Sequence, residues 1–231
     1  MSEGMPSPFN FRRPLKGKSM NKYYRILERI ITEGKMQTNK KGSILYLLNE
    51  QLSLTPADLL DVFEGHNIAR KKLRSELQLF MQGERNVEKY REAGINWWDY
   101  CGSILVNSYP TYFEKLPPLI RKINRERRNS KNYVLFLGET GAESNQAPCL
   151  SLVQFQLDEG ELVLPAYQRS SDANLGLPSD IYHLYLMARQ IEFPLKSITL
   201  YLGNVHIYEN NIPGTRALIA GDEGVRFELN V

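Results

Sequence analysis

The spacing of apolar residues changes from a helical to a strand-like period near residue 130, and this change restricts the folds that the chain can adopt. The segment NKYYRILERIITEG (21–34) repeats apolar residues at helical spacing and stops at Gly34, a common C-terminal helix signal. The segment TPADLLDVFEG (55–65) begins with a Thr cap and has Pro at its first helical position. We predict helices over 21–34, 55–65, 69–83, 86–94 and 110–127, the first with an apolar face of Tyr24, Leu27, Ile30 and Ile31.

The second half of the sequence indicates strands. The segments NYVLFLGE (132–139), LSLVQFQL (150–157) and ELVLPAYQ (161–168) are short and rich in apolar and aromatic residues. Asp158-Glu159-Gly160 predicts a tight turn that pairs the last two as a hairpin. Helices first and antiparallel strands later predict an α+β fold. The remaining predicted elements are a helix over 179–193 with Ser179 as its cap and a strand over 197–208.

The length and the charge distribution predict one domain preceded by a short arm. The 231 residues suit one large domain or two small ones, and no linker divides them. The formal net charge of +3 is accounted for by FRRPLKGK at 11–18. We interpret 1–19 as a flexible basic arm and 20–231 as a single domain. Such an arm can favour nucleic acid, but a solvated terminus is the commoner case, so no nucleic-acid partner is expected.

Several classes of protein are disfavoured by what the sequence lacks. No apolar run approaches the about 18 residues of a membrane span, and no apolar signal region opens the chain. We therefore expect no membrane association and a cytoplasmic location. Cys101 and Cys149 are expected to be free thiols rather than a structural disulfide. His66, His183 and His206 are too scattered to predict a metal site.

Cys149 and Arg169 form the first candidate site. Pairing of the two strands across the turn at 158–160 would bring position 149 close to position 169. A guanidinium beside a thiol lowers the pKa of the thiol and favours a nucleophilic thiolate. A buried structural thiol is the alternative interpretation, because free Cys is often buried.

Two further groups of polar residues allow both a functional and a structural interpretation. Gln168, Arg169 and Ser170 carry the donor groups that bind a phosphate, although they could equally form a polar strand end. His206 and Tyr208, two residues apart, point to one face of a strand. They are either ligand contacts or satisfied polar groups of the core.

Four motifs together resemble the thymidylate synthase family in that family's order and spacing. They are APC (147–149), QF (154–155), YQRSSDANLGLP (167–178) and GNVHIY (203–208). Weaker similarity covers YYRILERIITEG (23–34), ELQLFMQGERN (76–86) and NWWDY (96–100), so the resemblance extends over most of 20–212. It implies that 20–231 is a three-layer α+β catalytic domain with a mixed or antiparallel sheet and that the protein is a homodimer formed through this sheet. It also implies methylenetetrahydrofolate as the cofactor.

The resemblance implies transfer of a one-carbon unit to carbon 5 of a pyrimidine nucleoside monophosphate. Cys149 would attack carbon 6, which makes carbon 5 nucleophilic and divides one difficult step into two. Glu76 matches the family's catalytic glutamate in a proton relay. Arg169 would bind the phosphate and help to keep Cys149 ionised. The other positions implied are Tyr109 near carbon 5, Gln168, Ser170, Ser171 and Lys40 at the phosphate end, His206 and Tyr208 on the sugar 3′-hydroxyl, Asp172 on pterin and base, and Trp98 and Gly176 on the folate side.

Asp180 is the most informative departure from the family. Thymidylate synthases have Asn in a Gly-Leu-Pro-x-Asn context, whereas this chain has Gly-Leu-Pro-Ser-Asp at 176–180. An Asn amide matches O4 and N3–H of uracil, while an ionised carboxylate offers only acceptors and suits the N4 amino group of cytosine. Asp at this position resembles the deoxycytidylate and cytidylate hydroxymethylases of the family. The alternative interpretation is a surface Asp that caps a helix after a shifted turn.

Other departures concern the phosphate site and the C-terminal part. Lys40 stands where the family usually has an arginine, and Ser130-Lys131-Asn132 stands where paired arginines follow a Ser, with Arg127 and Arg128 upstream. Only residues 209–231 follow Tyr208, so the segment that closes over folate is expected to be missing or replaced. Poor closure would admit water and favour hydroxymethylation over methylation, whereas a retained Trp98 argues the other way.

Three functions follow from the sequence. The leading hypothesis is (deoxy)cytidylate hydroxymethylation through a Cys149 adduct. The alternative is a divergent thymidylate synthase that methylates dUMP. The third is a nucleotide-binding family member without folate chemistry, against which the presence of Cys149, Glu76 and Arg169 together argues. The sequence does not separate ribose from deoxyribose, because the His206 and Tyr208 contact concerns the 3′ position.

Overall fold

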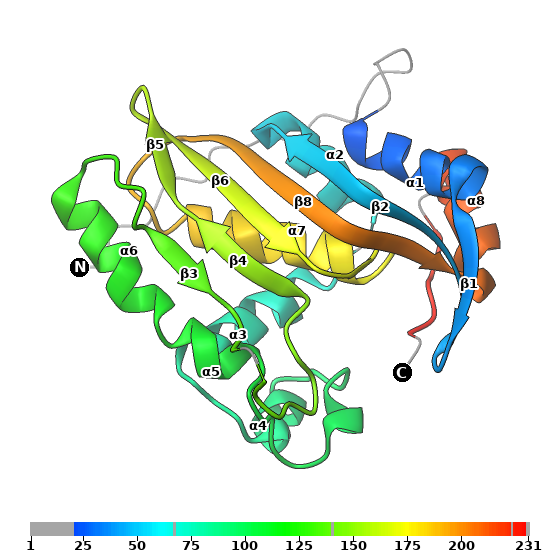
Figure 1. Ribbon diagram of the computed structural model, residues 1–231, viewed down its shortest axis with the longest axis horizontal. Coiled ribbons are helices and arrows are strands. Elements are labelled where there is room, and N and C mark those ends of the chain that lie inside the picture. Colours follow the sequence, from blue (N-terminus) through cyan, green and yellow to red (C-terminus); the bar gives the residue numbers. More distant parts are fainter. Residues whose placement is uncertain (1–20, 67, 140, 223, 230–231) are drawn as a thin grey trace.

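The computed structural model describes residues 21–66, 68–139, 141–222 and 224–229 (Figure 1). The predicted arm, residues 1–19, lies outside these ranges. In chain order the elements are α1 (Lys22–Glu33), β1 (Lys35–Asn39), β2 (Gly42–Leu54), α2 (Pro56–Gly65), α3 (Arg70–Met81), α4 (Val87–Glu92), the 3₁₀ helix η1 (Asp99–Cys101), α5 (Tyr109–Phe113), α6 (Leu116–Glu126), β3 (Val134–Phe136), β4 (Leu150–Gln154), β5 (Gln156–Asp158), β6 (Glu161–Gln168), β7 (Ser171–Asp172), α7 (Gly176–Ala188), β8 (Leu195–Tyr208), the 3₁₀ helix η2 (Glu209–Asn211) and α8 (Ile212–Ile219).

The strands form one mixed sheet. Its order is β1-β2-β8-β6-β4-β3, with β5 paired to β6 and β7 paired to β8. β8, orange in Figure 1, runs antiparallel to β2 on one side and parallel to β6 on the other. β4 and β6 are antiparallel. The predicted α+β fold with a mixed sheet is therefore confirmed.

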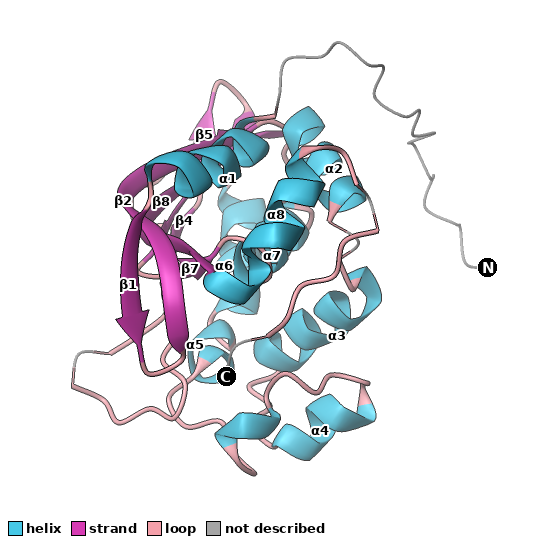
Figure 2. Ribbon diagram, turned by 90° about the vertical axis from the view of Figure 1, so that its right-hand side faces the viewer, coloured by secondary structure: helices cyan, strands magenta, loops and turns pink. Residues whose placement is uncertain are grey.

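The helices lie on one face of the sheet, and α7 is the central one (Figure 2). Leu177, Ile181, Leu184 and Met187 of α7 are fully buried, and the other residues of the helix are buried or half-buried. A helix with no fully exposed side must be surrounded by other elements. α7 packs against α2, α3, β6, β7 and β8. Within the described ranges, no helix is long and apolar enough to cross a bilayer.

The predicted helices of the first half form, and α2 begins as expected. The Thr55 hydroxyl accepts from the Asp58 amide at 3.4 Å, while Asp58 Oδ2 accepts from the Thr55 amide at 2.9 Å. These reciprocal bonds make a capping box, which satisfies donors that the first turn leaves unpaired.

The buried face of α1 differs from the predicted one. Its buried residues are Tyr23, Ile26, Leu27 and Ile30, rather than Tyr24, Leu27, Ile30 and Ile31. Tyr23 turns inward because its hydroxyl donates to the Ala173 carbonyl at 2.6 Å and lies 2.5 Å from His66 Nε2. Polar partners in the core, which helical spacing alone does not reveal, decide the face.

The predicted helix over 110–127 is divided into α5 and α6. Pro117 and Pro118 occupy the first turn of α6. Neither has an N–H to bond a carbonyl of the preceding helix, so a continuous ladder cannot form.

Ser179 is predicted to cap this helix, but it does not cap α7. The helix begins at Gly176, and the Ser179 hydroxyl donates to the Leu175 carbonyl at 2.8 Å. Pro178 lies in the first turn, where its missing N–H would be unpaired in any case. The helix also ends at Ala188, before the predicted residue 193.

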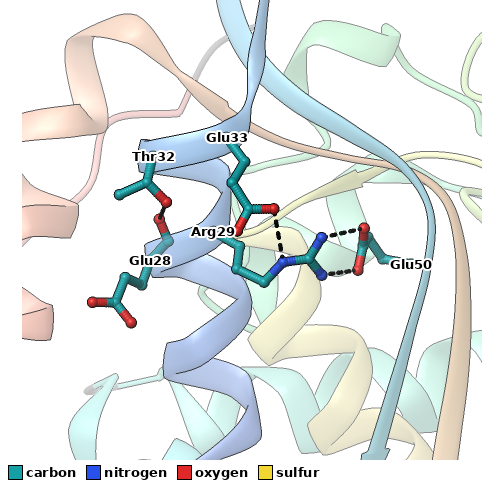
Figure 3. A network of polar contacts seen from close by, with 5 residues as sticks. All are labelled: Glu28, Arg29, Thr32, Glu33 and Glu50. Carbon is teal, nitrogen blue, oxygen red and sulfur yellow. Dashed lines mark hydrogen bonds and ion pairs between the residues drawn. The ribbon is translucent and has the colours of Figure 1, made fainter.

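No strand is predicted from the sequence between residues 35 and 54, yet β1 and β2 form a long hairpin there. The apolar residues of β2 do not alternate regularly, and Asn49 has a positive φ of 57° at a break in its pairing with β8. Arg29 of α1 holds β2 from the helix side, through two bonds to Glu50 at 2.5 and 3.1 Å and one to Glu33 at 3.0 Å (Figure 3). Pairing with β8 and this contact, rather than the local pattern, favour the strand.

The predicted turn at 158–160 is confirmed. Asp158 pairs with Glu161, and the intervening Glu159 and Gly160 have positive φ values of 52° and 84°. Two residues of positive φ are typical of the type I′ turn that suits twisted hairpins. The predicted strand over 150–157 is divided at Phe155 into β4 and β5, and the one over 132–139 is shortened to β3.

Removal of the α2 cap should destabilise the protein. We expect Thr55→Ala to lower the free energy of unfolding by about 1 kcal/mol, because the Asp58 amide loses its acceptor. Urea unfolding followed by circular dichroism measures this change. Thr32→Ala is the matched control, because the exposed Thr32 hydroxyl bonds only the Glu28 carbonyl of its own helix. Equal losses in the two variants would contradict the role of Thr55.

Candidate active site

Cys149 and Arg169 lie side by side at one end of the β4–β6 pair. The Arg169 amide donates to the Cys149 carbonyl at 3.0 Å. The Arg169 guanidinium donates to the carbonyls of Pro148 and Ala147 at 3.0 and 2.9 Å. The juxtaposition predicted from the hairpin is therefore present, and the guanidinium is fastened to the loop that carries the thiol.

The protonation of Cys149 depends on opposing effects. Burial raises the pKa of the thiol above its ordinary value, whereas the Arg169 cation lowers it. Asp180 acts in the same direction as burial, and Lys41 acts in the same direction as Arg169. Arg169 is thus the largest influence in favour of the thiolate. The second cysteine, Cys101, is also a free thiol, as predicted.

Tyr109 holds the backbone of the nucleophile. Its hydroxyl oxygen accepts from the amides of Cys149 and Leu150 at 3.0 and 3.1 Å. Its ring stacks on Phe80 at a centroid distance of 5.3 Å. Burial raises the pKa of Tyr109 well above its ordinary value, and the charges of Asp180 and Cys149 add to this. The hydroxyl therefore stays neutral and keeps its own proton available for donation.

Gln168 and Asp180 join the end of β6 to α7. Gln168 Nε2 donates to Asp180 Oδ2. Gln168 is fully buried, and its Oε1 makes no hydrogen bond to the described part of the chain. The contact of Gln168 with a phosphate stays a prediction, and the amide itself lies against Asp180.

Asp180 lies inside α7 and is not the surface cap of the alternative interpretation, which is therefore wrong. Burial raises the pKa of Asp180 to about 7. Among the smaller effects, His183 lowers this pKa, Glu76 raises it and the Gln168 bond lowers it. Asp180 consequently changes protonation near neutral pH.

Glu76 of α3 is buried and receives two indole N–H groups, with His183 close by. Its Oε1 accepts from the indoles of Trp97 and Trp98 at 2.5 and 2.6 Å, and its Oε2 lies 3.3 Å from His183 Nε2. Charge-assisted bonds of this kind keep a buried carboxylate in one orientation. Glu76 is also close enough to Asp180 to influence its pKa.

His206 and Tyr208 form a second part of the site on β8. Their rings meet edge to face at 5.4 Å, and both side chains are buried. His206 Nδ1 lies 2.9 Å from Asn204 Oδ1, and burial lowers the pKa of His206 to about 4, so the ring is neutral at pH 7. β7 pairing places Asp172 opposite His206. An open depression of about 450 Å³ beside Tyr208 is lined also by Gly42, Ser43, Glu209 and Asn210.

Ser170, Ser171 and Lys40 stay predicted contacts of the substrate. Ser170 is half-buried next to Arg169, and the buried Ser171 Oγ makes no hydrogen bond within the described residues. Lys40 and Lys41 both lie in the β1–β2 turn. Lys41 favours the Cys149 thiolate, and its Nζ lies 5.3 Å from the centre of the Tyr100 ring.

Asp172, Gly176 and Trp98 stay predicted contacts of the folate side. Asp172 Oδ1 accepts from the amides of Asn174 and Leu175 at 2.9 and 3.4 Å. A Cβ built on Gly176 would lie 3.8 Å from the Asp172 Cβ, so these residues are neighbours. Trp98 is buried, whereas Trp97 is half-buried.

Three residues of the site, His183, Trp97 and Lys41, were not predicted from the sequence. His183 follows Asp180 by three residues in a helix, so its position beside Asp180 could have been expected. Trp97 and Lys41 adjoin Trp98 and Lys40, and local spacing alone does not decide which neighbour faces the site.

The fold brings the free thiol of Cys149 beside Arg169, with the carboxylate of Asp180 close enough to influence the pKa of that thiol. The family model described as thymidylate synthase matches residues 21–229. The chain therefore belongs to the thymidylate synthase family. It is a one-carbon transferase that acts at carbon 5 of a pyrimidine nucleotide, and the family uses methylenetetrahydrofolate as the one-carbon donor.

Arg169 should control how readily Cys149 ionises. We expect Arg169→Gln to raise the pKa of the Cys149 thiol further, because the nearest cation is lost. The pH midpoint of Cys149 alkylation by iodoacetamide, measured peptide by peptide with mass spectrometry, should move upward, and Arg169→Lys should restore part of the change. Alkylation of Cys101 in the same samples is the internal control, because Arg169 does not influence its pKa. An unchanged Cys149 midpoint in Arg169→Gln would count against this role.

Proposed function

We propose that the substrate is cytidine or deoxycytidine monophosphate and that the product is the 5-hydroxymethyl nucleotide. The observation that carries this proposal is the carboxylate of Asp180 at the inner end of the site. Asp180 is held by the buried Gln168 and influences the pKa values of Cys149 and Tyr109, so it belongs to the same cluster as the nucleophile.

Asp180 has one oxygen to offer to the base. Its Oδ2 accepts from Gln168, while Oδ1 makes no hydrogen bond within the described residues. An ionised carboxylate accepts from the N4 amino group of cytosine and repels O4 of uracil. A polar site that is mismatched to its ligand can discriminate against it by ~10⁴-fold or more. The ionised form of Asp180 therefore favours cytosine.

The neutral form of Asp180 supports dUMP as a second candidate substrate. A protonated Oδ1 donates a hydrogen bond to O4 of uracil, which removes the repulsion that the ionised form exerts. Because the pKa of Asp180 is raised to about 7, both forms are populated near neutral pH. This candidate corresponds to a divergent thymidylate synthase that methylates dUMP.

Each side chain of the cluster has a place in the chemistry. Cys149 Sγ forms a bond to carbon 6, and the electrons of the 5,6 double bond move to carbon 5. Carbon 5 becomes the nucleophile for a one-carbon unit, which methylenetetrahydrofolate supplies when bound. Loss of the carbon 5 proton, assisted by Glu76 and Tyr109, with release of tetrahydrofolate leaves an exocyclic methylene on carbon 5. Addition of water to this methylene and expulsion of the Cys149 thiolate restore the 5,6 double bond and give the hydroxymethyl group. Arg169 binds the phosphate and favours the thiolate at both ends of this cycle.

The nucleotide preference and the product mass test this proposal. With methylenetetrahydrofolate, the wild type should release tritium from carbon 5 of dCMP or CMP, and mass spectrometry should show the gain of one CH₂O unit. Asp180→Asn should shift the preference toward dUMP by up to ~10⁴-fold, because an amide matches uracil. Cys149→Ser is the blank without a nucleophile. Turnover of dUMP alone by the wild type would refute the cytidylate proposal. Nucleotide binding with no tritium release from dCMP, CMP or dUMP would favour a binding protein without folate chemistry.

We also propose that two copies of the chain associate through the open face of the sheet. The helices cover only the other face (Figure 2). Phe136 is 63% exposed, Tyr201 46% and Tyr167 44%. Large apolar side chains on an uncovered surface are typical of an interface. They belong to one row across neighbouring strands, which runs through Gln51, Tyr201, Tyr167, Leu152 and Phe136 in register.

A charge in this row should dissociate the dimer. We expect the wild type to sediment as a dimer and Tyr201→Asp to sediment as a monomer, because an uncompensated carboxylate would be buried between the two sheets. Analytical ultracentrifugation measures the change. Ala57→Asp adds the same charge at an exposed position of α2, on the helix side, and should stay dimeric. A monomeric wild type, or a dimeric Tyr201→Asp, would contradict the proposed interface.

A further inference from the structure

His183 is a buried titratable residue beside the proposed base site, and the chemistry described above does not use it. It lies on α7, one turn after Asp180, and is 5% exposed. Its Nε2 is 3.0 Å from the Leu73 carbonyl oxygen and 3.3 Å from Glu76 Oε2, both on α3. The ring therefore bridges the helix that carries the proton relay and the helix that carries Asp180.

The partners of Nε2 determine where the ring carries a proton. The Leu73 carbonyl can only accept, so Nε2 must be protonated. Nδ1 makes no hydrogen bond within the described residues, and its protonation decides whether the ring is a cation. The charged groups that face the ring are Glu76 from α3 and Asp180 from α7, and both are acidic.

The surroundings favour the cation. Burial acts to lower the pKa of His183, but the contact with Glu76 and the charges of Glu76 and Asp180 outweigh it and leave the pKa above its ordinary value. A neutral ring would leave two carboxylates in one buried cluster, and one of them would take up a proton. Glu76 is held by two indole N–H groups, whereas Asp180 accepts only from Gln168. Asp180 is therefore the carboxylate that would be protonated.

We propose that His183 is a specificity-determining residue, whose imidazolium keeps Asp180 ionised and so makes the site accept the amino group of cytosine and reject O4 of uracil. The inference rests on the proposed function, because it concerns how the same site selects its pyrimidine. His183 acts through Asp180 and needs no contact with the base, so it is a positioning residue rather than a catalytic one.

His183→Gln tests the proposal, because Gln can still donate an N–H toward Glu76 but carries no charge. The ratio of kcat/KM for dCMP to that for dUMP, measured by tritium release, should fall by about tenfold or more at pH 7.5. In the wild type this ratio should decrease as the pH is lowered and Asp180 is protonated. In His183→Gln the decrease should occur at a higher pH, because loss of the cation raises the pKa of Asp180.

A double-mutant comparison shows whether the effect passes through Asp180. In the Asp180→Asn background, His183→Gln should leave the nucleotide preference unchanged, because no carboxylate remains at position 180. An equal change of preference in both backgrounds would overturn the proposal. The proposal would also be overturned if His183→Gln lowered kcat equally for dCMP and dUMP and left the kcat/KM ratio and its pH midpoint unchanged. That result would indicate that His183 only fixes the position of Glu76.

Nitrogen-15 NMR of the histidine side chains in the wild type tests the charge directly, whether or not the variants fold. The chain has three histidines, and burial lowers the pKa values of His66 and His206 to about 4. At pH 7 we expect one imidazolium, from His183, and two neutral rings. A neutral His183 would overturn the proposal. Absence of tritium release from dCMP, CMP and dUMP in the wild type would instead refute the proposed function, so the two failures are distinguishable.

Discussion

The pairing of β6 with strands on both sides is the constraint on which the rest of the structure depends. Gln168, the last residue of β6, lies opposite Leu150 of β4 and Leu202 of β8. Both pairings end at Gln168. Cys149, just before β4, and Arg169, just after β6, therefore lie at the same end of the sheet, and β8 continues from there to His206. Because side chains alternate along a strand, a slip of one residue would turn Gln168 outward and Arg169 into the core.

The inner part of the site contains ionisable groups that would be costly to bury without partners. Glu76 meets this cost with two indole N–H groups and the nearby His183 ring, Asp180 with the Gln168 amide, and Tyr109 with two backbone amides. These bonds join α3, α5, α7 and the β4–β6 end of the sheet. Burial raises the pKa of Asp180 to about 7, whereas His183 and the Gln168 bond act to lower it, so packing and hydrogen bonding together set its protonation.

The parts of the molecule that sequence patterns predicted best are governed by neighbours in the chain. The Thr55 capping box and the turn at 159–160 need only a few consecutive residues, and both form as expected. The closeness of Cys149 and Arg169 also follows, because a two-residue turn sets the register of the hairpin. Two of the predictions that were wrong involve distant partners. The face of α1 is decided by Tyr23 bonding Ala173, and the β1–β2 hairpin is favoured by pairing with β8.

The sequence by itself determined the α+β class, the family, the closeness of Cys149 and Arg169, and the presence of Asp180 where the family has an amide. All of these depend on residue types and spacings that can be read without knowledge of the fold. Only the tertiary structure decided that Gln168 bonds Asp180, that Lys41 acts on the pKa of Cys149, and that His183 lies against Glu76. The physical reason is that protonation and hydrogen bonding in a buried site depend on groups far apart in the chain, which packing alone brings within a few ångströms of each other.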